Sequence, residues 1–423
     1  MATTNSGPTG AQALRKPSLA AFVDAKEGAA LNRAAMPAVD AIALCQALIR
    51  CPSVTPEDAG VLGVLEGALK PLGFKCERLR FEAPGTLATE NLYARLGTAR
   101  PNFCFAGHTD VVPPGERTLW NHDPYGAELA DGVLYGRGAA DMKSGVAAFV
   151  AAVGNFLKRG APKGSISLLI TNDEEGPGTN GTAKVLNWLR TKKEPIDHCI
   201  VGEPTGSKTA GDTIKIGRRG SMNCRVSVRG VQGHSAYPQG AVNPIPIMAE
   251  FVGRVATLTL DTGTEHFEPS TIAFTSLDVG NAATNVIPAV ARAAFNIRYN
   301  DLHTPDSLLR KIETTAHEVG RAMGGEIGIE VVSRGEVFLT APGAFTELLR
   351  LAVSSATGAT PQFSTSGGTS DARYIKSYCP VAELGLHSRT AHKTDECVAV
   401  TEIEKLVRIY EAILALYFAN PPK

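Results

Sequence analysis

Three short segments place carboxylates or histidines directly after runs of apolar residues. In "FAGHTDVVPPG", His108 and Asp110 stand two positions apart after such a run. Residues two apart in an extended chain project to the same side, so one can bind a metal ion while the other orients it. A histidine ligand usually donates its second ring N–H to a carboxylate. Taken alone, H-x-D is equally the polar end of an ordinary strand.

The segment "TNDEEG" follows the apolar run 166–170 and contains Asp173, Glu174 and Glu175. Adjacent residues at a strand end project in different directions, so one glutamate can hold a metal ion while the other acts on the water that the ion activates. Glu203, in "VGEPT", ends the next apolar run in the same way. Crowded carboxylates repel one another unless cations lie among them, which favours a divalent metal.

Other candidate ligands stand in helix-start and loop segments. Asp141, in "YGRGAADMKSG", precedes a long helical pattern, where backbone N–H groups favour a negative charge. A plain helix N-cap explains this aspartate by itself. His387 and His392, in "ELGLHSRTAHKTDE", are candidate nitrogen ligands. Carboxylate and imidazole ligands with an open position suit catalytic zinc, and a shared carboxylate indicates two ions roughly 3.5–4 Å apart.

The elements that must carry these residues alternate along the chain. Apolar helical patterns occupy residues 38–50 and 141–160. Buried-strand patterns occupy residues 91–96, 102–107, 165–171 and 198–203. This alternation predicts an α/β fold with a mostly parallel central sheet, whose ligand site lies at the carboxyl ends of the strands. A last amphipathic helix is expected from Thr401, which has capping-box spacing to Glu404.

The chain has 423 residues, which is long for one hydrophobic core, because cores stop growing at roughly 250–300 residues. After residue 215 the pattern changes to alternating strands, at 221–230 and 291–300, with helical segments near 241–257 and 305–323. This α+β pattern predicts a smaller domain inserted into the larger one. The expected division is an extension, a first catalytic part, an inserted domain and a second catalytic part, at residues 1–35, 36–219, 220–333 and 334–423.

The composition argues against several classes of partner. Forty-two Lys and Arg balance 42 Asp and Glu, so no summed charge attracts nucleic acid or an anionic membrane. The longest apolar runs, such as 145–153, fall short of the ~20 residues that a membrane helix needs. Eight scattered cysteines without a C-x-x-C pair are typical of buried thiols in a reducing cytoplasm. We expect a cytoplasmic protein that acts on a small molecule, with no nucleic-acid or membrane partner.

Eight motifs, over about residues 38–419, resemble in order those of the M20 family of dinuclear-zinc amidohydrolases and peptidases, and within it the desuccinylases. They are "GHTDVVPPG", "YGRGAADMKSG", "TNDEEG", "VGEPT", "GRRGS", "RGVQGHSAYP", "TNVIP" and "SGGTSDARYIK". The resemblance implies a zinc-peptidase-like catalytic domain and an inserted α+β dimerisation domain. It implies hydrolysis of N-succinyl-L,L-2,6-diaminopimelate to succinate and L,L-2,6-diaminopimelate, in lysine and diaminopimelate synthesis. Another M20 enzyme, such as an acetylornithine deacetylase or a carboxypeptidase, would share the metal ligands.

The resemblance also implies a role for each matching residue. Two Zn²⁺ ions, one of them replaceable by Co²⁺, are expected on five side chains: His108 and Glu203 on one ion, Glu175 and His392 on the other, and Asp141 bridging both. Glu174 is the expected general base, and Asp110 is expected to orient His108. A cis peptide bond is expected at Asp141–Met142.

The inserted domain is implied to form a homodimer and to lend His234 to the partner's active site, where it would stabilise the oxyanion. A substrate with several carboxylates favours guanidinium groups as recognition elements. Arg218 or its neighbour Arg219, and Arg298, match the carboxylate-binding arginines of the family. The other implied substrate contacts are Lys215, Ser221, Tyr237, Asn285, Gly368 and Thr369.

One segment departs from the family pattern. In "GLHSRTAH", Ser388 replaces a residue that can contact substrate, and Arg389 adds a charge, while the ligand His392 is kept. His387 has no family role and is interpreted as a loop residue. A non-enzymatic binding or scaffold protein is the alternative class, and it would be expected to have lost ligands or base. A zinc-independent serine or cysteine hydrolase is disfavoured because no G-x-S-x-G segment occurs and no cysteine stands in a recognisable nucleophile motif.

Overall fold

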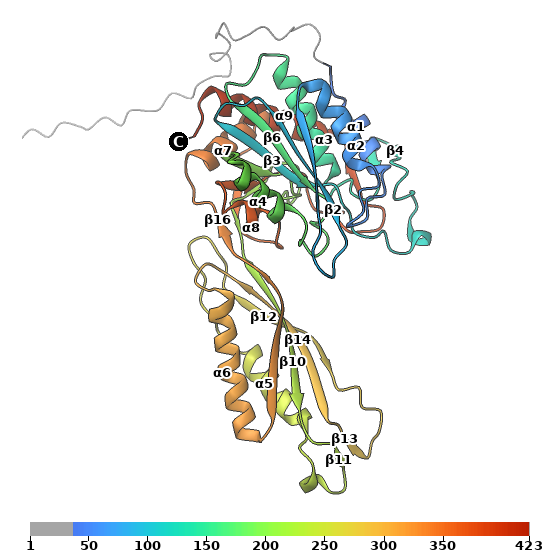
Figure 1. The fold of residues 1–423 in the computed structure, drawn as a ribbon, viewed down its shortest axis with the longest axis vertical. Helices are drawn as coiled ribbons and strands as arrows, with labels where there is room; N and C mark the ends of the chain where they lie inside the picture. The colour runs from blue at the N-terminus through green and yellow to red at the C-terminus, as the bar shows by residue number, and fades with distance from the viewer. Residues whose placement is uncertain (1–36, 423) are drawn as a thin grey trace, which may run out of the picture.

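A computed structural model describes residues 37–422 and shows a larger and a smaller lobe (Figure 1). The predicted extension at residues 1–35 lies outside the described residues. The larger lobe contains an eight-stranded sheet of order β1-β2-β6-β3-β7-β18-β8-β17. Its four central strands are mutually parallel, which confirms the predicted α/β class: β6 (Ser165–Thr171), β3 (Asn102–His108), β7 (His198–Val201) and β18 (Val381–Glu383). The outer strands are β1 (Lys75–Phe81), β2 (Thr89–Leu96), β8 (Thr213–Lys215) and β17 (Gln362–Ser364).

Helices cover both faces of this sheet. On one face lie α1 (Ala41–Ile49), α2 (Val61–Leu69), α3 (Lys143–Leu157), α7 (Ala344–Thr357) and α9 (Val400–Ala419). On the other face lie α4 (Thr182–Lys192) and α8 (Ala372–Ile375). Strand β3 serves both layers, because Phe103 and Phe105 join the first core while Cys104 and Ala106 join the second. Its continuous apolar sequence follows from this double burial.

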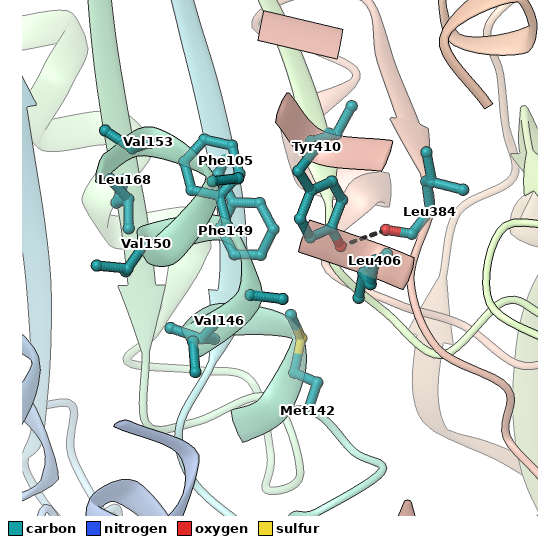
Figure 2. Close-up of a cluster of buried hydrophobic side chains, with 14 of the residues drawn as sticks. Phe105, Met142, Val146, Phe149, Val150, Val153, Leu168, Leu384, Leu406 and Tyr410 are labelled. Atoms are coloured by element: carbon teal, nitrogen blue, oxygen red, sulfur yellow. Dashed lines mark hydrogen bonds between the residues drawn. The ribbon is translucent and has the colours of Figure 1, made fainter. Parts of the chain in front are cut away.

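Aromatic packing joins helices α3 and α9 to strand β3 in the core of the larger lobe (Figure 2). The rings of Phe105 and Phe149 stack with centroids 4.4 Å apart, and Tyr410 meets both edge-on at 5.7 Å. The buried Tyr410 hydroxyl donates a hydrogen bond of 2.7 Å to the main-chain oxygen of Leu384. A buried hydroxyl needs such a partner, so this contact fixes α9 against the end of β18.

The smaller lobe is an antiparallel sheet with helices on one face. Its strand order is β12 (Thr271–Asp278), β14 (Val290–Tyr299), β10 (Gly220–Arg229) and β15 (Glu326–Gly335). Helices α5 (Pro244–Ala256) and α6 (Pro305–Met323), both predicted, pack on it and enclose a separate hydrophobic core. The chain enters and leaves this lobe through the paired strands β9 (Gly217–Arg218) and β16 (Phe338–Leu339). Strand β15 continues to Gly335, past the boundary expected at residue 333.

A short ladder of β11 (Gly233–His234) with β13 (Val286–Ile287) lies at the end of the smaller lobe that points away from the larger one (Figure 1). We call this end the tip, and it comprises residues 231–242 and 279–289. A further small sheet joins β4 (Leu129–Ala130), β5 (Val133–Tyr135) and β19 (Cys397–Ala399). Single 3₁₀ turns occupy Lys70–Leu72, Arg117–Leu119 and Pro238–Gly240.

The predicted capping box of the last helix was wrong. Helix α9 begins at Val400, and its N-cap is Ala399, which makes no side-chain cap. Strand β19 runs directly into the helix, so no turn is left in which Thr401 can act as cap. Within residues 37–422, no helix has the length and apolar character needed to cross a membrane.

Candidate metal centre

The predicted ligands gather at one edge of the large sheet, although they come from distant parts of the sequence. His108 is the last residue of β3, Glu175 follows β6, and Glu203 follows β7. Asp141 lies just before α3, and His392 lies in the loop before β19. Because β3, β6 and β7 are parallel, their carboxyl ends meet at the same edge of the sheet. The strand order therefore positions the site where open α/β sheets carry ligands.

The carboxylate of Asp141 lies between the two histidines. His108 Nε2 is 3.2 Å from Asp141 Oδ1, and His392 Nε2 is 3.4 Å from Asp141 Oδ2. His392 Nε2 also lies 2.7 Å from Glu175 Oε1, and His108 Nε2 lies 3.7 Å from Glu203 Oε1. Each histidine therefore shares Asp141 and has one glutamate of its own, which is the arrangement expected of a bridging carboxylate.

These side chains fit a pair of divalent cations. Donor atoms of His108, Asp141 and Glu175 lie within 4.8 Å of one another, and so do those of His108, Glu174 and Glu203. Within residues 37–422, the buried Glu203 Oε1 has no hydrogen-bond partner. A buried carboxylate oxygen without a partner is costly, and a cation would satisfy it. Imidazole and carboxylate donors are ligands that Zn²⁺ accepts.

Burial and mutual repulsion shift the pKa values of this cluster. Burial and the neighbouring Asp141 raise the pKa of Glu203 to about 8. Burial and repulsion from Glu203 also raise the pKa of Glu174 well above its usual range. Hydrogen bonds to Asp141 and Glu175 raise the pKa of His392 to about 10. Crowded carboxylates and imidazoles with pKa values raised in this way are suited to bind cations, which can take the place of the protons.

In His108 and Asp141, the two candidate ligands at the middle of the cluster, burial opposes the charged form and hydrogen bonds favour it. The pKa of the histidine is therefore raised and that of the aspartate is lowered. Burial opposes a charge on His108, but the hydrogen bond to Asp141 and the charge of Glu203 raise its pKa well above the ordinary value. Burial likewise opposes ionisation of Asp141, yet hydrogen bonds from His108 and His392 hold its pKa below the usual range. Asp141 is therefore the most strongly ionised carboxylate between the two rings.

Asp110 contacts His108 mainly through its main-chain oxygen, not through the side-chain carboxylate that the sequence pattern suggested. His108 Nδ1 lies 2.9 Å from the main-chain oxygen of Asp110 and 3.7 Å from its carboxylate. The carboxylate instead accepts hydrogen bonds from the main-chain N–H groups of Glu174 (3.4 Å) and Glu175 (3.0 Å). Asp110 thus orients the ring with its backbone and holds the turn of the two glutamates with its side chain. The Asp141–Met142 peptide bond is cis, as predicted.

Two fully buried glutamates under these loops were not found by sequence reasoning. Glu396 accepts a hydrogen bond from the main-chain N–H of Asp141, and Glu383 forms an ion pair with Arg218. Each stands beside a short apolar run, in "VAEL" and "TDECV". That pattern is also the signal of an ordinary strand end, so the sequence could not show that these carboxylates point inward.

The candidate substrate-binding residues near the junction of the lobes differ in how many hydrogen bonds they already make within the protein. Arg218 Nε donates to both oxygens of Glu383, at 2.8 and 2.7 Å, and its Nη1 donates to the main-chain oxygen of Gly368 at 2.8 Å. Thr369 belongs to the same loop, which Arg218 thereby holds. Lys215 Nζ donates to Ser364 Oγ at 3.1 Å and Ser366 Oγ at 2.8 Å.

Arg219 and Arg298 are less satisfied. Within residues 37–422, the buried atoms Arg219 Nε and Arg298 Nη1 have no hydrogen-bond partner. Burial and the nearby charge of Arg219 lower the pKa of Arg298. Ser221 pairs with Arg298 in the register of β10 and β14. Arg219 also lines a cavity of about 190 Å³ together with His266, Glu268, Ser364, Thr365 and Ser366.

The tip residues are not brought to the metal centre within one chain. His234, Tyr237 and Asn285 are exposed, and His234 lies in β11 at the far end of the smaller lobe (Figure 1). His234 Nδ1 accepts a hydrogen bond of 3.0 Å from the N–H of Ala236, which leaves Nε2 free to donate. His387 pairs with Gly206 in an isolated bridge and belongs to neither candidate ligand group.

A cluster of imidazole and carboxylate donors at the carboxyl ends of an α/β sheet is the arrangement of a metallohydrolase. The peptidase family M20/M25/M40 matches residues 104–416, and the chain belongs to this family. Two curated relatives carry the name succinyl-diaminopimelate desuccinylase. The protein from Rhodospirillum centenum is 57% identical and covers 90% of this chain and 98% of its own length. That from Parvibaculum lavamentivorans is 55% identical, with 90% and 96% covered.

Solved structures share the fold at low sequence identity. The aminopeptidase PepT from Bacillus cereus superposes with a TM-score of 0.74 at 23% identity, covering 91% of this chain and 100% of its own. A dinuclear metal-binding M20 peptidase from Bacillus subtilis superposes with a TM-score of 0.68 at 12% identity, covering 90% and 98%. These likenesses confirm the predicted α/β fold class.

Proposed function

We propose that this protein hydrolyses N-succinyl-L,L-2,6-diaminopimelate to succinate and L,L-2,6-diaminopimelate, in the cytoplasmic synthesis of lysine and diaminopimelate. The observation that carries the proposal is sequence identity above 50%, over 90% of the chain, with relatives named for that reaction. The convergence of the expected ligands at one sheet edge supports it independently, because the reaction is an amide hydrolysis of the kind that metal centres catalyse.

The residues that would hold the cofactor are Asp141 and the four side chains around it. We assign His108 and Glu203 to one Zn²⁺, Glu175 and His392 to the other, and Asp141 to both, from the distances between their donor atoms. When bound, such ions polarise a carbonyl group and lower the pKa of water.

Glu174 is the proposed general base. It shares the ligand cluster with His108 and Glu203 but is not needed as a ligand in this assignment. Burial and the charge of Glu203 raise the pKa of its carboxyl group, and cations on the neighbouring donors would keep that group ionised and able to accept a proton. It would take a proton from the attacking water and return it to the leaving amine, so that one carboxyl group serves both halves of the reaction.

Substrate carboxylates would be bound where the two lobes meet. Among the residues that the structure describes, the buried Nε of Arg219 and Nη1 of Arg298 have no hydrogen-bond partner, so a carboxylate between them would satisfy both and reduce their repulsion. Arg218 is already committed to Glu383 and would act mainly by holding the loop of Gly368 and Thr369. This difference favours Arg219 over Arg218 as the direct contact.

The remaining contacts require a second copy of the chain. We propose a homodimer formed by the smaller lobe, in which His234, Tyr237 and Asn285 of one copy face the metal centre of the other. All three side chains are exposed at the far tip, away from the metal centre of their own chain. They can therefore reach a metal centre only if it belongs to another copy of the chain. In the partner's site, the Nε2–H of His234 would donate to the developing oxyanion.

The direct test compares succinyl-, acetyl- and peptidyl-amide substrates with the zinc-loaded protein. The expected result is a kcat/KM for N-succinyl-L,L-2,6-diaminopimelate that exceeds the values for the N-acetyl compound and for dipeptides. Faster cleavage of N-acetylornithine would replace the proposal with a deacetylase, and faster cleavage of dipeptides would replace it with a peptidase.

A further inference from the structure

We propose that Glu396 is a positioning residue of the metal centre, which holds Asp141 and His392 in a fixed relation to one another. The inference rests on the proposed function, because it concerns the ligands assigned there. Glu396 touches none of the reacting atoms in this assignment and acts through the main chain of Asp141.

Each carboxylate oxygen of Glu396 accepts two hydrogen bonds from residues 137–141, the segment that ends at Asp141. Oε1 accepts from the main-chain N–H groups of Ala140 (2.8 Å) and Asp141 (3.0 Å). Oε2 accepts from the N–H of Gly138 (3.0 Å) and from Arg137 Nη1 (2.7 Å). The side chain is fully buried. One carboxylate therefore fixes the backbone of the segment that carries the bridging ligand.

The main chain of Glu396 also connects this segment to the loop that carries His392. Glu396 stands four residues after His392, and its own main-chain oxygen accepts a hydrogen bond of 2.8 Å from the N–H of Gly136. Arg137 Nη1 also donates to the main-chain oxygen of Lys393, at 3.1 Å. Lys393 directly follows His392, so Arg137 and Glu396 together clamp residues 136–141 against residues 392–396.

Stability alone does not account for this pair. Replacing a buried ion pair by apolar residues of similar volume is often neutral or stabilising, because desolvation offsets much of the attraction. A hydrophobic contact would therefore hold the two segments together at least as well. An apolar residue cannot accept hydrogen bonds from the backbone N–H groups of Gly138, Ala140 and Asp141, and so cannot set the orientation of Asp141.

The two ions should depend on Glu396 to different extents. The ion assigned to Glu175, His392 and Asp141 has two ligands from the clamped segments. The ion assigned to His108 and Glu203 takes both of those ligands from the ends of β3 and β7, which Glu396 does not touch. Losing the clamp should therefore weaken the ion on Glu175 and His392 more than the other.

The experiment is Zn²⁺ titration of the full chain carrying Glu396→Gln. Glutamine keeps the shape, but it has one acceptor oxygen, and its NH₂ group would face main-chain donors. Wild type is expected to bind two ions per chain. The variant is expected to bind one ion with wild-type affinity and the second ion about 10–100-fold more weakly. That is the usual effect of removing a residue that orients metal ligands through hydrogen bonds. The absorption spectrum of the Co²⁺-loaded protein should change in the same variant.

Glu383→Gln is the matched control, because Glu383 is also fully buried and paired with an arginine, but it contacts neither clamped segment. It should lower the unfolding temperature and leave the affinity of the ion on Glu175 and His392 unchanged. Glu396→Asp keeps the charge and should restore part of the second affinity. If Glu396→Gln does not fold, Arg137→Lys replaces it, since it removes the fork between Glu396 and Lys393 and should weaken the same ion.

An unchanged pair of affinities with an unchanged Co²⁺ spectrum, in a variant that only unfolds at lower temperature, would overturn the inference. Equal weakening of both ions would also overturn it, because the clamp would then have no preference between them. A wild-type chain that binds a single ion would instead contradict the proposed two-ion centre itself, whatever the variants do.

Discussion

The metal centre and the tip of the smaller lobe are built in opposite ways. Around the centre, His108 is 1% exposed and Asp110 is fully buried, and buried carboxylates hold the main chain of the ligand loops. At the tip, Tyr237 is 65% exposed, and the β11–β13 ladder comprises two residue pairs. Side chains held by buried hydrogen bonds are preorganised before a metal ion or substrate binds. The exposed side chains of the tip would be held in this way only in contact with another protein surface.

This contrast separates two kinds of functional residue. A preorganised group loses its function when its own chemistry is removed, and its supports can be tested one at a time. A tip residue loses its function also when the second surface is missing, so it can be complemented from another chain. The predictions below test that distinction, beginning with the largest effect.

Removing the general base should have the largest effect on turnover. In Glu174→Gln, kcat is expected to fall by about 10²–10⁴-fold, because proton transfer from water loses its acceptor. Zinc content, measured by elemental analysis, should stay at the wild-type value. Glu175→Gln is the comparison, since Glu175 is an assigned ligand and its loss should lower the zinc content. Appreciable turnover by Glu174→Gln would show that the base is another group.

The tip should be replaceable from a second chain. His234→Ala is expected to lower kcat by about 10²–10³-fold through loss of an oxyanion donor. Co-expressing His234→Ala with Glu174→Gln should restore roughly a quarter of wild-type activity, because half of randomly paired dimers are mixed and each mixed dimer has one complete site.

The control for this recovery pairs His234→Ala with the double variant Glu174→Gln/His234→Ala, which offers no intact tip histidine and should give none. Activity in the first mixture that only equals the sum of the two single variants would show that His234 does not serve a partner's site.

Much of the fold and the ligand cluster could be predicted from sequence because both depend on local patterns. The apolar run before His108 is buried on both faces, and the parallel order of β3, β6 and β7 then brings the residues that follow these strands together. The resemblance named five candidate ligands, and the structure gathers the other four around Asp141.

The supports of the site could not be predicted, since each depends on a contact between segments far apart in the sequence. The reach of Glu396 to Asp141 spans 255 positions, and the pairing of Arg218 with Glu383 spans 165. No local pattern reports that a glutamate at a strand end turns inward. For the same reason, sequence could not decide between Arg218 and Arg219, because the decision depends on which guanidinium is already occupied.

Arg218 and Arg219 should therefore fail in different ways. Arg218→Ala leaves Glu383 buried without its partner, and breaking such a pair costs about 3–5 kcal/mol of unfolding free energy. Arg219→Ala removes a group with two weak protein contacts, a 3.4 Å hydrogen bond to the main-chain oxygen of Pro269 and a 3.9 Å ion pair with the exposed Glu268, so stability should change by less than about 1 kcal/mol. Its KM should instead rise about 10-fold or more, as expected for one charged hydrogen bond. Urea unfolding and steady-state kinetics separate the two, and the assignment is wrong if Arg219→Ala binds substrate normally.

The smallest expected effect is a pH-dependent shift in the stability of the chelated protein. Burial raises the pKa of Glu203 from its ordinary 4.5 to about 8, and hydrogen bonds raise that of His392 from 6.5 to about 10. Groups with a raised folded-state pKa contribute stability at low pH and lose it as pH rises through that value, because the folded state then holds protons that the unfolded state has released. Asp141 stays ionised throughout this range and adds no change of its own.

The melting temperature of the chelated protein should therefore fall as pH rises from about 5 to about 8, and Zn²⁺ should raise it more at pH 8 than at pH 5. Thermal unfolding at several pH values, with chelator or with Zn²⁺, measures both. The tip contains no comparable cluster among residues 37–422, so His234→Ala should follow the wild-type curve, whereas Glu203→Gln should flatten it. A stabilisation by Zn²⁺ that does not depend on pH would mean that the ions bind without displacing protons from these carboxylates and imidazoles.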